Sequence, residues 1–225
     1  MKYTKPYIAP TLTVDAVIFQ ISNGVLETLL LKRANEPFKD AWALPGGYNA
    51  AGETTHHALH RIVEQKTGID TEKDLAYIEQ LYTFDTIDRD PRGHAVSVTY
   101  MGCGRDIPLR DAGSRTAFLE VSNLPELAYD HANIIRYAHE RLKSKLTYTN
   151  AVSAFLAPRF TLTQLQSAYE IIFGREFDKR NFRKKFLSLG LIQETDEFWR
   201  DGAHRPAKLY KFKRSKLQSL ERSFD

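Results

Sequence analysis

Cysteine is almost absent from this chain, since only Cys103 occurs among its 225 residues. The chain therefore cannot close an intramolecular disulfide, and it has no cysteine cluster for a structural zinc site. Long apolar runs are absent too. None approaches the roughly 18 residues that a membrane helix needs, and the first residues, MKYTKPYIAPTLTV, lack the apolar segment of a signal peptide. These absences predict a protein of the cytoplasm with no membrane partner.

Charge of one sign does not dominate the chain, but charge is unevenly divided along it. The composition, 42% hydrophobic and 27% charged residues, is that of an ordinary globular protein. Residues 147–225 carry 15 Lys+Arg against 9 Asp+Glu, a net charge of +6, whereas residues 1–146 carry 17 against 19, a net charge of −2. This asymmetry predicts that a polyanionic partner binds the C-terminal part.

The N-terminal part mixes strand and helix signals. Apolar, β-branched runs bounded by turn residues predict strands, and apolar residues at helical spacing predict helices. Gly68 stands where the first helix should stop. The expected strands span residues 12–19, 25–31, 77–84, 96–101 and 117–121, and the expected helices span residues 54–66 and 131–146. The mixture predicts an α+β domain.

The character of the chain changes after Lys145. One helix is expected to open at Thr161 and end at Gly174, and a basic helix is expected over residues 178–189. The segment LIQE, a charged turn over residues 196–205 and the alternating KLYKFK then predict a two-stranded hairpin. Helix, turn, basic helix and hairpin is the order of a winged helix. We therefore divide the chain into domains 1–146 and 147–225.

A glycine and glutamate motif begins at Gly47, after the second strand, and continues through the first helix to Ile69. The pattern G-x5-E-x7-R-E-U-x-E-E-x-G-U, in which U is bulky and apolar, defines the Nudix box. This chain resembles it at six positions with the correct spacing, Gly47, Glu53, Arg61, Val63, Gly68 and Ile69. The resemblance implies a Nudix-type α/β/α sandwich with a mixed sheet.

The same motif lacks the three glutamates that the family uses to hold magnesium. Ile62, Gln65 and Lys66 stand in their places, at i, i+3 and i+4 of the expected helix, and so on one helix face. An isoleucine cannot ligate a metal, and a lysine adds a positive charge where the cation would sit. Glu64 lies about 200° around the helix from position 62 and cannot substitute. We therefore expect no metal site, no catalytic residues and no hydrolase activity, with Ile62 joining the core.

The resemblance extends beyond the box. The segments LETLLLKR and NEPFKDAWALPGG are similar to Nudix proteins that act on ADP-ribose, and IDRDPRGHAVSVTY resembles the Nudix-related regulators of NAD metabolism. With the basic winged helix, the resemblance covers nearly the whole chain. It implies a homodimeric transcriptional repressor of NAD metabolism that binds a double-stranded DNA operator, takes ADP-ribose or a related nucleotide as effector and needs no cofactor.

Two alternatives remain open. One is an active Nudix hydrolase of ADP-ribose-like substrates, against which the missing glutamates argue. The other is a sugar-responsive regulator of carbohydrate utilisation, as in relatives of the same family.

Candidate ligand residues follow from the charge of a diphosphate. Without a metal, phosphates must be met by guanidinium groups, ammonium groups or backbone amides. Trp42, with Phe38 and Tyr82, is a candidate to stack on the base, although core packing is the more frequent role of a tryptophan. Arg61 has the alternative of pairing with Glu53 to hold the turn. The full set of candidates is Arg33, Lys39, Trp42, Glu53, Arg61, Lys66, Arg89 and Arg92.

Three histidines in the box segment also invite a metal interpretation. His56 and His60 are spaced i, i+4, so they share a helix face. Because no third ligand stands at helical spacing, solvated side chains are the favoured interpretation.

Candidate DNA-binding residues lie on the basic helix and the following hairpin. Arginine and asparagine suit guanine and adenine edges, so Arg180, Asn181 and Arg183 are candidates to read bases. The lysines are candidates for phosphates, and the hairpin loop is the expected wing. The remaining candidates are Lys179, Lys184, Lys185, Arg205 and Lys208. A basic helix in a protein-interaction module is the alternative interpretation.

Overall fold

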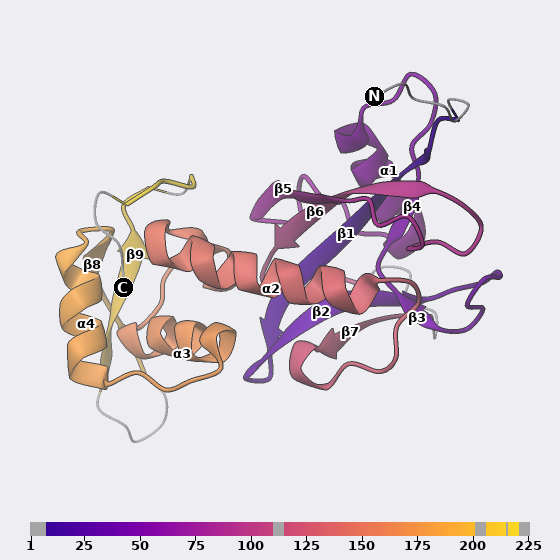
Figure 1. Cartoon of the computed structure of the whole chain (residues 1–225). Helices are drawn as coiled ribbons and strands as arrows, with labels where there is room; N and C mark the ends of the chain where they lie inside the picture. The colour runs from indigo at the N-terminus through magenta and orange to yellow at the C-terminus, as the bar shows by residue number, and fades with distance from the viewer. Residues whose placement is uncertain (1–7, 110–114, 201–205, 215, 221–225) are drawn as a thin grey trace, which may run out of the picture.

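The computed structural model describes residues 8–109, 115–200, 206–214 and 216–220 (Figure 1). Seven strands form one mixed sheet in the order β3-β2-β1-β6-β5, with β4 paired to β1 and β7 paired to β2. Among the described strand pairs of this sheet, β1 and β6 run parallel and the others are antiparallel. The strands are β1 (Thr11–Ser22), β2 (Val25–Lys32), β3 (Trp42–Ala43), β4 (Gly46–Tyr48), β5 (Tyr77–Phe84), β6 (Ala95–Cys103) and β7 (Thr116–Glu120).

Helices cover both faces of this sheet. Alternation along β1 sends Val14, Ala16 and Ile18 to one face, where they pack with helix α1 (Thr55–Thr67). Val17 and Phe19 point to the opposite face, which helix α2 (His131–Tyr148) covers. The expected α/β/α sandwich with a mixed sheet is confirmed.

The C-terminal part is a winged helix, as predicted. Thr161 and Gln164 form a capping box at the start of α3 (Leu162–Phe173), and Gly174 ends that helix in the left-handed conformation, with φ 66°. Phe182 and Phe186 of α4 pack edge-on against Tyr169 of α3, with ring centroids 5.3 and 5.8 Å apart. The other elements are α4 (Lys179–Ser188), β8 (Ile192–Trp199), β9 (Ala207–Phe212) and the short 3-10 helices η1 (Val121–Asn123) and η2 (Ala151–Phe155).

The hairpin differs from the sequence prediction at one point. The charged turn expected from Asp196 onward begins later, because β8 continues to Trp199. Phe198 and Trp199 pair with Lys208 and Ala207, and a register shift between Glu194 and Phe198 absorbs the intervening residues. The charged residues Asp196 and Glu197 therefore belong to strand β8 and not to the turn.

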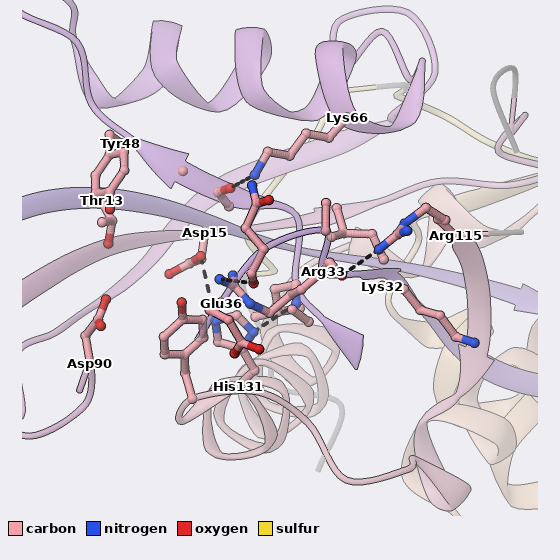
Figure 2. A pocket seen from close by; sticks show the side chains of 18 of the residues that line it. Thr13, Asp15, Lys32, Arg33, Glu36, Tyr48, Lys66, Asp90, Arg115 and His131 are labelled. Atoms are coloured by element: carbon pink, nitrogen blue, oxygen red, sulfur yellow. Dashed lines mark hydrogen bonds and ion pairs between the residues drawn. The ribbon is translucent and has the colours of Figure 1, made fainter. Parts of the chain in front are cut away.

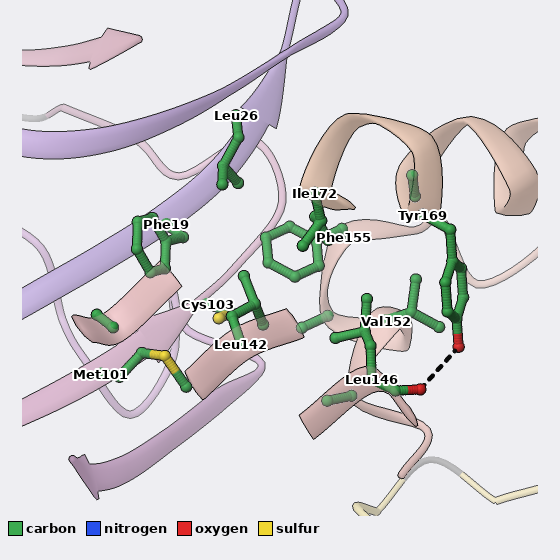
Figure 3. Close-up of a cluster of buried hydrophobic side chains, with 14 of the residues drawn as sticks. Phe19, Leu26, Met101, Cys103, Leu142, Leu146, Val152, Phe155, Tyr169 and Ile172 are labelled. Atoms are coloured by element: carbon green, nitrogen blue, oxygen red, sulfur yellow. Dashed lines mark hydrogen bonds between the residues drawn. The ribbon is translucent and has the colours of Figure 1, made fainter. Parts of the chain in front are cut away.

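A single apolar cluster joins the two parts of the chain (Figure 3). It contains Phe19 from the sheet, Leu142 from α2, Phe155 from η2 and Ile172 from α3. The buried hydroxyl of Tyr169 donates a hydrogen bond of 3.2 Å to the Leu146 carbonyl. The predicted domain boundary after residue 146 lies inside α2, so this helix packs against both parts. None of the described helices is long and apolar enough to cross a membrane.

Candidate functional site

A cavity of about 490 Å³ opens at one end of the sheet, beside the N-terminus of α2 (Figure 2). Its volume lies within the range of small-molecule sites. Figure 2 shows Lys66 entering from α1 on one side and His131 lying on the opposite side, with Asp15 of β1 between them. The polar lining residues include Asp15, Arg33, Tyr48, Lys66, Arg89, Asp90, Arg92, Arg115, Tyr129 and His131.

The Pro-Gly-Gly segment at residues 45–47, which leads into β4, shapes this cavity because at Gly46 it passes where no side chain fits. A Cβ atom on Gly46 would stand 1.8 Å from Oδ1 of Asp15. A Cβ atom on Gly47 would stand 3.3 Å from Cδ1 of Ile62. The segment therefore passes close to both the β1 carboxylate and the apolar residue that replaces the first box glutamate.

A buried polar network forms the floor of the cavity. The hydroxyl of Ser97 donates to Asp15, and the Arg89 guanidinium lies 3.6 Å from the same carboxylate. Arg89 also donates two hydrogen bonds, of 3.1 and 2.8 Å, to Asp130. Nδ1 of His131 accepts from the Leu44 amide at 2.9 Å, and burial lowers the pKa of His131. A neutral His131 then carries its proton on Nε2, which lies 3.9 Å from Oδ1 of Asp15.

Tyrosine rings and arginines form one wall. Tyr129 adopts a positive φ of 57°, and the Arg33 guanidinium lies 4.8 Å from its ring centroid. The Arg92 guanidinium lies 5.8 Å from the rings of both Tyr48 and Tyr129, and it pairs with Asp90 at 2.6 Å. The buried Tyr129 hydroxyl has no hydrogen-bond partner among the described residues. Guanidinium groups beside tyrosine rings can bind phosphate and stack on planar rings.

Lys66 brings a cation to the position of a box glutamate. Its ammonium group donates to the Gly46 carbonyl. Burial of that group lowers the pKa of Lys66, and the nearby Asp15 carboxylate opposes the shift. The third altered box position, Gln65, is exposed, whereas Ile62 is only 3% exposed and belongs to the core cluster of α1. No group of three His, Cys, Asp or Glu side chains in the described part of the chain is arranged to hold a metal ion.

Half of the candidate ligand residues line the cavity, namely Arg33, Lys66, Arg89 and Arg92. Lys39 is exposed outside it, and half-buried Trp42 packs against the core that joins the two parts, with the Lys32 ammonium 5.3 Å from its ring. Phe38 is exposed and packs edge-on with Tyr129, with centroids 4.9 Å apart, and Tyr82 contacts Phe84 and Tyr137 elsewhere.

Glu53 and Arg61 form an ion pair with each other. Arg61 donates to both carboxylate oxygens, at 2.8 and 2.7 Å, and to the Tyr48 carbonyl at 3.1 Å. The Arg61 hydrogen bonds, followed by one from the Ala50 amide, lower the pKa of Glu53 to about 2. This pair holds the turn that follows β4, which is the alternative that the sequence left open for Arg61.

The sequence candidates omitted several lining residues, among them Asp15, Tyr48, Arg115, Tyr129 and His131. Of these residues, Asp15 alone could have been identified from the sequence. It is a carboxylate inside the apolar run LTVDAVIF, and a buried carboxylate must be paired. Tyr129 and His131 precede or open a helix that is far along the chain from the box, and their arrival at the cavity depends on tertiary packing.

The candidate DNA-binding residues are distributed over two elements. Lys179, Arg180, Asn181 and Lys184 are exposed on α4, and Lys185 is half-buried. Arg183 is half-buried and donates a 3.1 Å hydrogen bond to Thr163 of α3, so it braces the two helices. Lys208 of β9 lies 3.5 Å from Glu194 and 5.0 Å from the Phe198 ring. Arg205 lies outside the described residues.

Comparison with known protein families matches both parts of the chain. Residues 10–141 match the NUDIX domain family, and residues 152–212 match the NrtR DNA-binding winged helix domain family. The ADPR responsive transcriptional repressor NtrR of Acinetobacter baylyi is 36% identical over 213 residues, which cover 92% of this chain and 83% of that protein.

Solved structures extend the likeness to the arrangement of both domains. Shewanella oneidensis NrtR complexed with a 27mer DNA superposes with a TM-score of 0.80 at 31% identity, covering 95% of this chain and 99% of that one. The NUDIX domain of the same Shewanella protein, complexed with ADP ribose, superposes with a TM-score of 0.54 at 33% identity. That match covers 60% of this chain and 90% of the other.

Proposed function

Because the chain belongs to the family of NrtR-type transcriptional regulators, which join a Nudix domain to an NrtR winged helix, we propose that it is an ADP-ribose-responsive repressor of NAD metabolism. The observation that carries the proposal is the continuous likeness of both domains to a regulator solved on DNA. A regulator of this kind works where the chromosome is, so we place it in the cytoplasm. We expect it to bind as a homodimer, since such DNA readers usually recognise two half-sites.

The chemistry of the cavity supports ADP-ribose as the effector. Arg33, Arg92 and Lys66 offer positive groups for a diphosphate without a metal ion. The faces of Tyr48 and Tyr129 suit a base or ribose. A sugar effector would leave the positive groups without phosphate partners, which favours the nucleotide.

We propose that the Nudix domain does not hydrolyse its ligand. Ile62 fills the first glutamate position with a buried apolar side chain close to Gly47, and Lys66 places an ammonium group at the Gly46 carbonyl. Glu53, the remaining box carboxylate, is occupied by Arg61. A divalent cation would therefore meet one neutralised carboxylate and one positive charge. Release of AMP from ADP-ribose in the presence of Mg²⁺ would favour the active hydrolase instead.

Fluorescence anisotropy on labelled DNA from the upstream region of the gene tests the proposal directly. We expect tight, salt-sensitive binding of the full-length protein that ADP-ribose weakens. Ribose and unrelated sugars serve as matched controls for the effector. If DNA binding responds to a sugar but not to ADP-ribose, the effector is a sugar and not a nucleotide. If the affinity equals that for random DNA, the labelled region is not the operator.

The Lys66→Ala variant is expected to weaken ADP-ribose binding by about 1–2 kcal/mol, roughly 5- to 30-fold, because a charge-assisted contact to phosphate is lost. Isothermal titration measures the change, with the neighbouring exposed Gln65→Ala as the control. An unchanged affinity in Lys66→Ala would remove Lys66 from the phosphate site.

Helix α2 is the element that we propose to connect effector and DNA. At its N-terminus, Asp130 accepts a hydrogen bond from Arg89 at the cavity floor. Near its C-terminus, the Leu146 carbonyl accepts a hydrogen bond from the hydroxyl of Tyr169 in the winged helix. A ligand that changes the position of Arg89 or His131 therefore acts on the helix that carries the DNA-binding part. We also propose the division into domains 1–146 and 147–225, whose boundary lies inside this shared helix.

A further inference from the structure

Two histidines of α1 face each other on the surface of the Nudix domain, away from the ligand cavity. His56 and His60 are one helical turn apart, and their Nε2 atoms are separated by 3.4 Å. The ring centroids lie 4.4 Å apart at an interplanar angle of 68°. His56 is exposed and His60 is half-buried, so the two nitrogens are accessible from solvent.

This separation fits two ligands of one metal ion. Imidazole nitrogens lie about 2.0–2.1 Å from a bound zinc ion, and a tetrahedral angle between two of them sets the nitrogens roughly 3.3 Å apart. The observed 3.4 Å therefore matches the separation of two imidazole nitrogens that share one metal ion. Spacing of i, i+4 on a helix is what places both rings on the same side.

A neighbouring hydroxyl orients one of the rings. Nδ1 of His60 is hydrogen-bonded to Oγ1 of Thr71, a residue that is only 4% exposed. When Nδ1 donates its proton to this hydroxyl, Nε2 keeps the lone pair that faces His56. Metal-binding histidines commonly have such a partner on the second nitrogen, which fixes the tautomer and the ring orientation.

The surroundings of His60 are acidic. A surface hollow of about 280 Å³ beside the ring is lined by His57, His60, Glu64, Asp70, Thr71 and Glu72. The carboxylates favour a nearby cation electrostatically. In the described part of the chain no third His, Cys, Asp or Glu completes the set, so water molecules must fill the remaining positions.

We propose that His56 and His60 form a two-imidazole chelate for a divalent transition metal of the Cu²⁺, Ni²⁺ or Zn²⁺ class, oriented by Thr71. Two nitrogen ligands without thiolate suit these ions, with Cu²⁺ bound most strongly in this series. Both histidines lie within the Nudix box at positions that its pattern leaves open, and they are distinct from the altered metal positions Ile62, Gln65 and Lys66 further along the same helix. Because both ligands belong to adjacent turns of α1, the metal stabilises the folded helix.

Pulsed EPR of the full chain with one equivalent of Cu²⁺ tests this site, because it detects the remote nitrogens of coordinated imidazoles. We expect two coupled imidazoles in the native protein. His56→Ala and His60→Ala should each lower Cu²⁺ affinity on the order of tenfold or more, whereas His57→Ala, the matched surface control, should not. Equal affinity in all four proteins, or a loss confined to His57→Ala, would overturn the proposal.

A Thr71→Val variant separates orientation of the ring from simple proximity. It keeps the volume of the side chain and removes the acceptor for Nδ1, so we expect Cu²⁺ affinity to fall about tenfold while both imidazoles stay coordinated. A parallel measurement with Zn²⁺ should raise the unfolding temperature of the native protein and leave that of His60→Ala unchanged. Unchanged Cu²⁺ affinity in Thr71→Val would overturn the orienting role of this residue.

Discussion

Arg180→Ala is expected to weaken operator binding by about 1–3 kcal/mol, roughly 5- to 150-fold, while affinity for random DNA changes far less. Arg180 is exposed on α4, where Phe182 and Phe186 occupy the buried face. A guanidinium group in the major groove binds the two acceptors of a guanine, and its loss removes information about one base pair. Anisotropy with operator and random duplexes measures both affinities.

Lys184→Ala is the matched control for this experiment, since Lys184 is exposed on the same helix. A phosphate contact carries no sequence information, so its loss should weaken operator and random DNA to the same extent and reduce the salt slope by about 1. An equal loss on both duplexes in Arg180→Ala would mean that Arg180 contacts phosphate and not a base. Arg183 is a poorer choice because its bond to Thr163 gives it a structural role.

Gly46→Ala is expected to lower both the stability of the protein and its affinity for the effector. Its Cβ would stand 1.8 Å from Oδ1 of Asp15 and 3.1 Å from the Val14 carbonyl oxygen. Asp15 cannot swing away freely, since Ser97 donates to it and Arg89 lies beside it. We therefore expect the free energy of unfolding to fall by roughly 1–3 kcal/mol and ADP-ribose affinity to fall at least about tenfold.

Gly47→Ala provides the comparison for Gly46→Ala. Its Cβ would stand 3.3 Å from the terminal methyl of Ile62, a contact that a small rotation of a flexible side chain relieves. We expect a cost below about 1 kcal/mol and nearly native ligand binding. Urea unfolding and isothermal titration measure the two effects. If stability and ligand affinity fall equally in the two variants, the contact with Asp15 is not the reason why Gly46→Ala is unfavourable.

The positions of the elements followed closely from the sequence. Val25–Lys32, Tyr77–Phe84 and His131–Tyr148 lie within a few residues of their predicted ranges, and Gly68 and Gly174 end helices with φ values of 71° and 66°. Periodicity and glycine are local signals, and secondary structure follows local signals when packing agrees with them. The short helix η2 had no such signal, and β8 continued through a charged segment because β9 was available to pair with it.

The ligand site followed from the sequence only in part. Arg33, Lys66, Arg89 and Arg92 were candidates by charge and by closeness to the motif, and all four line the cavity. Lys39, Glu53 and Arg61 are charged and equally close to the motif, and Trp42 was a candidate to stack on the base, yet all four lie outside the lining. Charge and nearness in the chain cannot tell whether a side chain faces the cavity, the core or a partner on the same turn.

By itself the sequence determined the two-domain class, the altered Nudix box and the basic α4, because spacing, periodicity and charge are local properties of a chain. Only the tertiary structure decided that Tyr129 and His131 line one cavity with Asp15, and that Ile62 lies close to Gly47. It also decided that α2 belongs to both domains, through the cluster that joins Leu142 to Ile172. These contacts connect residues far apart in the chain, and burial of apolar surface, not local conformational preference, selects them.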